Sequence, residues 1–209
     1  SVASMLASVG VYAMIYGWPY AIGFVSLLAI HESGHALMMR RLGIPFSPMT
    51  FIPSVGAVVA MERHPTNAFD EGLVALAGPV VGGAAAVAVG AAGVLTNSQL
   101  LVLLGDVGIM LNLFNLLPIG FLDGGRIAGA LSKWTLVAGL GAGVSLAYTG
   151  AISNPLFYVI LVMAGFTTFE RFTGEPPHPK YFRISAGQKL TLGGAYLGLI
   201  MALLAAQAT

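Results

Sequence analysis

The sequence predicts an all-α membrane protein: a polytopic bundle of about six to seven transmembrane helices with a short membrane-embedded β-hairpin and a central core of three helices. Composition gives the first reason. Hydrophobic residues make up 57% of the 209 residues and charged residues only 8%, and the mean hydropathy is +0.87. Because a soluble domain has about 25% charged residues, this chain is expected in a membrane.

Charge and cysteine content exclude several other classes. The net charge is +1 and no basic run is present, so a nucleic-acid partner is not expected. The absence of cysteine excludes disulfides and thiolate metal sites. Membrane lipid is the expected surrounding, and the 28 glycines suit close helix packing within it. Because the chain begins with Ser1 rather than Met, we expect a processed or trimmed start.

Seven apolar segments are candidate membrane spans. Turn residues separate them, such as Trp18-Pro19-Tyr20 after the first and Thr96-Asn97-Ser98 after the third. The first is slightly short for a span of about 20 residues, and the second is long enough to cross with some tilt. The expected spans cover residues 2–17, 19–42, 68–95, 99–117, 134–150, 155–172 and 188–207.

The stretch from 43 to 65 differs in kind from the spans. Its prolines exclude a regular helix. Residues 49–52 and 55–61 are apolar, and they are predicted to form two short strands joined around Pro53. Such backbone is tolerated at membrane depth only where protein covers it or where it lines a cavity.

The basic residues predict which side each turn faces. Lys and Arg follow the second, fourth and sixth spans, whereas the turns after the third and fifth carry none. By the positive-inside rule, the even-numbered exits face the cytoplasm. The chain is therefore expected to be a multi-pass integral membrane protein whose second span ends on the cytoplasmic side.

The second expected span carries the pattern His31-Glu32-Ser33-Gly34-His35. On a helix, His31 and His35 lie one turn apart on the same face, where two imidazoles can bind one zinc ion. Glu32 is placed to take a proton from water as a general base. The alternative is two core histidines with a buried glutamate. That alternative is disfavoured, because an unpaired carboxylate in an apolar helix costs several kcal/mol.

A catalytic zinc site needs a third protein ligand, and two aspartates are candidates. Asp106 and Asp123 both lie in apolar surroundings, and their predicted depths separate them poorly. We favour Asp123, because it follows a helix broken at Pro118 and precedes two glycines. Irregular backbone there would line a polar cavity and could approach the ion closely. The alternative role for Asp106 is a hydrogen bond to a neighbouring helix.

Four motifs together resemble the site-2 proteases, a family of intramembrane zinc metalloproteases. They are His31-Glu32-x-x-His35, Ala77-Gly78-Pro79, Asn115-Leu116-Leu117-Pro118 and Leu122-Asp123-Gly124-Gly125. The resemblance covers residues 20–133. It implies one zinc ion per chain bound by His31, His35 and Asp123, with Glu32 as the general base. It also implies that Asn115 helps to hold substrate or the oxyanion, with an interhelical hydrogen bond as the alternative role.

The sequence departs from the commonest form of that family. Gly120 and Phe121 stand where many relatives have prolines, which resembles a compact branch with chloroplast and bacterial members. We expect no PDZ-like insert and no C-terminal nucleotide-binding module. The expected organisation is a single integral membrane domain over 1–209, with a catalytic core at about 19–133 and peripheral helices at 1–17 and 134–209.

The two short strands are the expected substrate contact. A transmembrane helix must unwind before cleavage, because its carbonyls are already hydrogen-bonded. An extended segment could then pair with a strand edge. The alternative is a plain membrane-embedded loop. The residues expected to contact substrate are Phe51, Val55, Gly56, Ala57, Val58 and Asn112.

The resemblance thus implies an intramembrane zinc metalloprotease that hydrolyses peptide bonds within transmembrane segments of membrane proteins. A catalytically silent receptor or chaperone on the same fold and a metal transporter are the alternatives. The active site is expected toward the cytoplasmic side of a prokaryotic plasma membrane, and the sequence leaves the oligomeric state open. His64 and His178 are expected to be ordinary interfacial or loop residues rather than zinc ligands.

Overall fold

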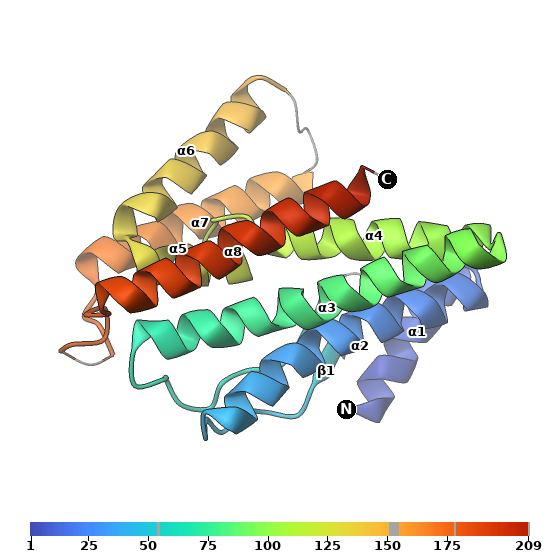
Figure 1. Ribbon diagram of the computed structural model, residues 1–209, viewed down its shortest axis with the longest axis horizontal. Coiled ribbons are helices and arrows are strands. Elements are labelled where there is room, and N and C mark those ends of the chain that lie inside the picture. Colours follow the sequence, from blue (N-terminus) through green and yellow to red (C-terminus); the bar gives the residue numbers. More distant parts are fainter. Residues whose placement is uncertain (54, 151–154, 178, 209) are drawn as a thin grey trace. The chain divides into compact units, whose positions relative to one another are not determined.

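The computed structural model describes residues 1–53, 55–150, 155–177 and 179–208. Within these residues the chain forms eight helices and one two-stranded sheet (Figure 1). The elements in order are α1 (Val2–Tyr16), α2 (Trp18–Arg41), β1 (Thr50–Ile52), β2 (Gly56–Val58), α3 (Ala68–Thr96), α4 (Gln99–Asn115), α5 (Asp123–Leu131), α6 (Lys133–Tyr148), α7 (Pro155–Thr173) and α8 (Ala186–Gln207).

The chain divides into two compact units. The first contains Ser1–His64, Ala77–Phe114 and Leu199–Thr209, and the second contains Pro65–Leu76 and Asn115–Gly198. The first unit therefore includes the sheet and the histidine pair of α2, and the second includes α5, α6 and α7.

Glycines let three helices of the first unit pack closely. A Cβ on Gly34 of α2 would lie 2.4 Å from the carbonyl oxygen of Ala77 in α3. A Cβ on Gly105 of α4 would lie 2.4 Å from the Cα of Gly90 in α3. Such close backbone approach provides the van der Waals contact that associates helices in lipid. A larger residue at either glycine would push two of these helices apart.

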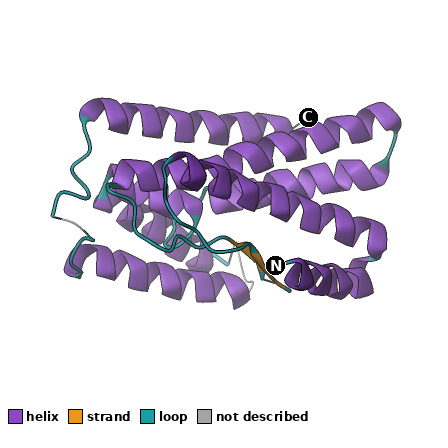
Figure 2. Ribbon diagram, turned by 90° about the horizontal axis from the view of Figure 1, so that it is seen from below, coloured by secondary structure: helices purple, strands orange, loops and turns teal. Residues whose placement is uncertain are grey.

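The predicted hairpin is confirmed. β1 and β2 pair antiparallel, with Phe51 opposite Ala57. The sheet, orange in Figure 2, lies beside the amino-terminal end of α1, where the Phe51 N–H donates to Ser4 Oγ over 3.2 Å. Phe51 is buried and packs with Val25 and Leu28 of α2. Helices α1 and α2 therefore supply the protein cover that such backbone needs in a membrane.

In the second unit, the connection between α4 and α5 packs against α7. Ile119 and Leu122 of this connection form an apolar cluster with Ile160 and Ala164. Gly120 adopts a φ of +49°, and a Cβ there would lie 2.9 Å from the Cα of Ala164. Glycine meets both the backbone and the packing requirement, so the connection lies tightly against the helix.

Three helices, α2, α3 and α8, are long and apolar enough to cross a membrane. The shorter helices α1 and α4 are also apolar. The chain is a helical membrane protein. The finer expectation of about six to seven spans is not confirmed, because among the helices of the described ranges only these three have the length and hydropathy of a span.

Candidate metal centre

Helix α2 carries the histidine pair, and its sequence explains its bounds. It begins after Gly17, with Pro19 in the first turn, where proline's missing N–H costs no hydrogen bond. It ends with Arg40 and Arg41, whose charges interact favourably with the negative end of the helix dipole. The buried residues in its second half are His31, Glu32, Gly34, His35 and Met39.

The two imidazoles of α2 face each other. His31 Nε2 and His35 Nε2 are 3.1 Å apart, and the two residues are only 4% and 7% exposed. Two nitrogen ligands on one tetrahedral zinc ion, each about 2.0–2.1 Å from it, are about 3.3 Å apart. One ligand atom from each of His31, Glu32 and His35 lies within 4.8 Å of the others. The pair therefore fits a single metal ion held between the two imidazoles.

Asn112 of α4 orients the first imidazole. Its Nδ2 donates to the carbonyl oxygen of Gly108 over 2.8 Å, and its Oδ1 lies 2.9 Å from His31 Nδ1. Because a carbonyl only accepts, the atom facing Gly108 is the amide nitrogen and the atom facing His31 is the amide oxygen. His31 Nδ1 must then carry the proton, which leaves the Nε2 lone pair facing His35.

Two glycines of α3 lie against this pair. A Cβ on Gly78 would come within 2.2 Å of His35 Nε2, and a Cβ on Gly82 would come within 3.0 Å of the Cβ of His31. The two glycines are four residues apart, so one face of α3 approaches both ligands. Sequence reasoning used Gly78 as part of a motif and missed Gly82. The spacing of small residues at i and i+4 was the available signal.

Glu32 lies between the histidines in sequence and is 8% exposed. Its Oε2 accepts a hydrogen bond from the Val59 N–H over 3.0 Å. Val59 directly follows β2, so the hairpin reaches the expected general base. This hydrogen bond fixes the position of one carboxylate oxygen of Glu32.

Asp123 belongs to the second unit, where it is the first residue of α5 and is 8% exposed. The expected helix break is present, because residues 116–122 between α4 and α5 are not helical, whereas Asp123, Gly124 and Gly125 form the first turn of α5. A Cβ on Gly124 would lie 2.1 Å from the carbonyl oxygen of Leu116. The glycine thus permits α5 to begin directly against the preceding segment. Asn115 is also in this unit, at the end of α4, and its role and the ligand role of Asp123 stay predictions.

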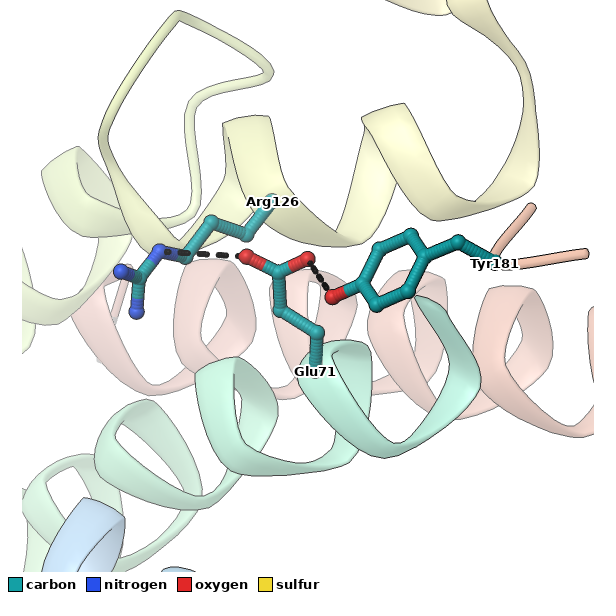
Figure 3. Close-up of polar contacts among 3 residues, drawn as sticks. All are labelled: Glu71, Arg126 and Tyr181. Atoms are coloured by element: carbon teal, nitrogen blue, oxygen red, sulfur yellow. Dashed lines mark hydrogen bonds and ion pairs between the residues drawn. The ribbon is translucent and has the colours of Figure 1, made fainter. Parts of the chain in front are cut away.

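A polar cluster ties the beginning of α5 to α3 within the second unit (Figure 3). The Tyr181 hydroxyl donates to Glu71 Oε2 over 2.6 Å, and Arg126 Nε lies 3.8 Å from Glu71 Oε1. The Ala68 N–H also donates to the Tyr181 carbonyl over 2.9 Å, so Tyr181 is bound to α3 at two points. Burial and the Glu71 carboxylate raise the pKa of the Tyr181 hydroxyl above its ordinary value.

The expected substrate contacts differ in exposure. Val55 and Val58 are 78% and 44% exposed, whereas the side chain of Phe51 is buried. Gly56 adopts a φ of +142°, a conformation that favours glycine. Asn112 has both ends of its amide bonded to protein atoms. Substrate binding by these residues stays a prediction.

Asp106, His64 and His178 are the remaining residues considered from the sequence. Asp106 is exposed on α4 and lines a recess at the turn between α3 and α4. Its alternative role, a hydrogen bond to a neighbouring helix, is not found among the residues that the structure describes. His64 is exposed in the loop before α3. His178 lies outside the described residues.

Fold and site together define a class: a helical membrane protein with a metalloprotease-type histidine pair on a buried helix. The family model of peptidase family M50 matches residues 19–99, which include α3 and all of α2 except its first residue. The chain is 32% identical over 185 residues to Rip3 of Mycobacterium tuberculosis, named as a zinc metalloprotease; the match covers 81% of this chain and 45% of the relative. Residues 19–99 of the chain thus match peptidase family M50, and a longer stretch is similar to a relative named as a zinc metalloprotease.

Two further matches were found. A protein of Synechocystis sp. named as zinc metalloprotease sll0528 is 26% identical over 142 residues, covering 63% of this chain and 37% of the relative. The chain thus spans less than half the length of these curated relatives. Among solved structures, the site-2 protease from Methanocaldococcus jannaschii matches with a TM-score of 0.49 and 20% identity, over 80% of this chain and 85% of that one.

Proposed function

We infer that this protein is an intramembrane zinc metalloprotease, which hydrolyses peptide bonds within transmembrane segments of membrane proteins. One zinc ion per chain would be held by His31, His35 and Asp123. The observation that carries this proposal is the separation of 3.1 Å between the buried Nε2 atoms of His31 and His35. The relatives' names support zinc as the ion, and Asp123 supplies the anionic third ligand expected from the motif.

The residues of the chain have distinct parts in the proposed reaction. Zinc, when bound, supplies Lewis acidity that polarises the scissile carbonyl and makes water more acidic. Glu32 takes a proton from the attacking water and then passes it to the leaving amine. Asn115 donates a hydrogen bond to the developing oxyanion. Burial of His31, Glu32 and His35 keeps bulk water away and so strengthens these electrostatic interactions.

The backbone of β2 is the proposed docking edge for an unwound substrate. The Phe51 N–H points to Ser4 of α1, so Phe51 turns its backbone groups away from β2. Its partner Ala57 therefore belongs to a pair without ladder hydrogen bonds and turns its own N–H and C=O away from β1. Those two groups are available on the outer edge of β2.

The same edge continues to the general base. Val59, two residues after Ala57, uses its N–H to bind the Glu32 carboxylate. Because alternate residues of a strand face the same side, Ala57 and Val59 share this edge. An extended peptide that pairs with Ala57 would thus run alongside Glu32. This supports the proposal that the hairpin, rather than a rigid pocket, presents the scissile bond.

We further propose the setting in which the enzyme works. The chain acts as one integral membrane domain, with its catalytic core at about 19–133 and peripheral helices on either side. By the positive-inside rule, Arg40 and Arg41 at the end of α2 support a cytoplasmic position for that end. The active site would then lie toward the cytoplasm of a prokaryotic plasma membrane, with membrane lipid and the substrate segment as partners.

Cleavage by the purified protein tests this function. Wild type and Glu32→Gln are compared on a defined transmembrane substrate in liposomes, with and without a zinc chelator. We expect chelator-sensitive cleavage by wild type and none by Glu32→Gln, which keeps both imidazoles and its zinc. Zinc flux across the liposome without cleavage would support a transporter instead. Substrate binding without turnover would support a receptor, and either result contradicts the proposal.

A further inference from the structure

We propose that Asn112 is a positioning residue for the metal centre. Its amide oxygen holds His31 in the tautomer that directs Nε2 toward the ion, and Gly82 provides the space for that contact. The inference rests on the proposed function for the identity of the ion as zinc. It concerns contacts among α2, α3 and α4 within the first unit.

Asn112 is a polar residue that is buried inside an apolar helix bundle. The residue is 2% exposed, and a buried amide is costly unless its polar atoms are bonded. Both bonds are present, to the Gly108 carbonyl on one side and to His31 Nδ1 on the other. The amide cannot turn around without placing its nitrogen against the His31 N–H and its oxygen against a carbonyl. The orientation of the acceptor is therefore fixed by α4 itself.

Gly82 of α3 closes the third side of this contact. A Cβ at this position would lie 2.7 Å from Asn112 Oδ1 and 3.0 Å from the Cβ of His31. The first separation is shorter than real Cβ contacts allow, so even alanine would displace the amide or the imidazole. The hydrogen bond between His31 of α2 and Asn112 of α4 therefore requires glycine at position 82.

The hydrogen bond matters because an imidazole has two neutral tautomers. Only the one with the proton on Nδ1 leaves Nε2 free as a metal ligand. Histidines that bind metals almost always donate the other N–H to an oxygen, and loss of that partner typically costs 10–100-fold in metal affinity. Asn112 supplies this oxygen to His31. It acts through the ligand and need not touch substrate or ion.

The hydrogen bond therefore predicts the tautomer of His31 in the metal-free protein. With Asn112 Oδ1 as the acceptor, we expect His31 to be protonated on Nδ1 and unprotonated on Nε2. The chain has only four histidines, so ¹⁵N-histidine spectra can be assigned with single His→Gln variants.

Nuclear magnetic resonance of metal-free protein in detergent at neutral pH is the first test, because it requires neither zinc nor activity. Wild type should show His31 as the Nδ1-protonated tautomer. Asn112→Leu, which has the same branched arrangement of side-chain heavy atoms and no acceptor, should show a mixture of tautomers. A His31 that carries its proton mainly on Nε2 in wild type would overturn the inference, and this result does not depend on any variant folding.

Zinc affinity, measured by chelator competition, is the second test. Asn112→Leu should bind zinc 10–100-fold more weakly than wild type, whereas Asn112→Asp, which keeps an oxygen acceptor, should restore most of that loss. Met110→Leu changes an exposed residue of the same helix, and it serves as the matched control that should bind zinc like wild type. Equal affinity of wild type and Asn112→Leu contradicts the inference. A wild type that binds no zinc contradicts the proposed function, while the tautomers still decide the role of Asn112.

Discussion

Gly78 lies so close to the His35 imidazole that there is no room for a Cβ atom at residue 78. At the scale of single residues, the histidine pair is thus placed by contacts that the ligands themselves do not supply. Gly78 and Gly82 admit the two rings, Asn112 orients one of them, and the Val59 N–H holds Glu32. Each of these contacts can be altered by one substitution that does not replace any of the proposed ligand residues.

Gly78→Ala tests the contact with His35. Its Cβ would fall 2.2 Å from His35 Nε2, so the ring must move or the helices must separate. Overpacking of this kind typically costs about 1–3 kcal/mol, and a displaced ligand should weaken zinc binding as well. Thermal unfolding and chelator competition measure the two effects. Gly141→Ala, at a helical glycine with nothing within 4 Å, is the control and should not lower zinc affinity.

At the scale of elements, two sets of contacts join helices and strands that are distant in the sequence. The hairpin joins α1 to Glu32, and the cluster of Glu71, Arg126 and Tyr181 joins α5 to α3. The ion pair in this cluster is partly exposed, so it contributes only about 0–1 kcal/mol. The hydrogen bond from Tyr181 to the carboxylate is short and charge-assisted, and it is the stronger of the two contacts.

The Tyr181 contact predicts a pH dependence of stability. The folded protein holds the hydroxyl proton to higher pH than the unfolded chain, because burial and Glu71 raise its pKa. The free energy of unfolding should therefore fall as pH rises above about 10, the ordinary tyrosine value. Melting temperatures in detergent from neutral to alkaline pH measure this. Tyr181→Phe should be less stable at neutral pH and show a smaller alkaline loss. Tyr148→Phe, at an exposed tyrosine, should match wild type. If Tyr181→Phe also matches wild type, the hydrogen bond from Tyr181 to Glu71 does not contribute to stability.

Proline at Ala57 tests the docking edge. It removes the N–H that faces away from β1 and spares the ladder hydrogen bonds of the hairpin. We expect Ala57→Pro to lose most cleavage of a transmembrane substrate while its zinc content stays normal. Ala57→Ser keeps the N–H and should cleave like wild type. Unchanged cleavage by the proline variant would mean that substrate does not pair with this strand.

At the scale of the whole molecule, the sequence predicted the helices, the hairpin and the histidine pair, because each rests on local periodicity or on a spacing of one turn. It did not predict α5, since Gly124 and Gly125 usually interrupt helices, and their packing against the preceding segment is not visible in sequence. The contact between His31 and Asn112 joins residues 81 apart in the chain. Contacts of that range depend on how helices pack, so this bond could not be predicted from the sequence.

The proposed zinc site takes ligands from α2 and from α5, and this claim is tested most directly by metal analysis. Two imidazoles and one water leave a tetrahedral zinc ion one ligand short, and an anion at that place also reduces its charge in a low-dielectric setting. Asp123→Ala and Asp106→Ala are purified in detergent, and the zinc bound per chain is measured for each. We expect Asp123→Ala to lose most of its zinc and Asp106→Ala to keep it. A zinc-loaded Asp123→Ala beside a zinc-free Asp106→Ala would contradict the site.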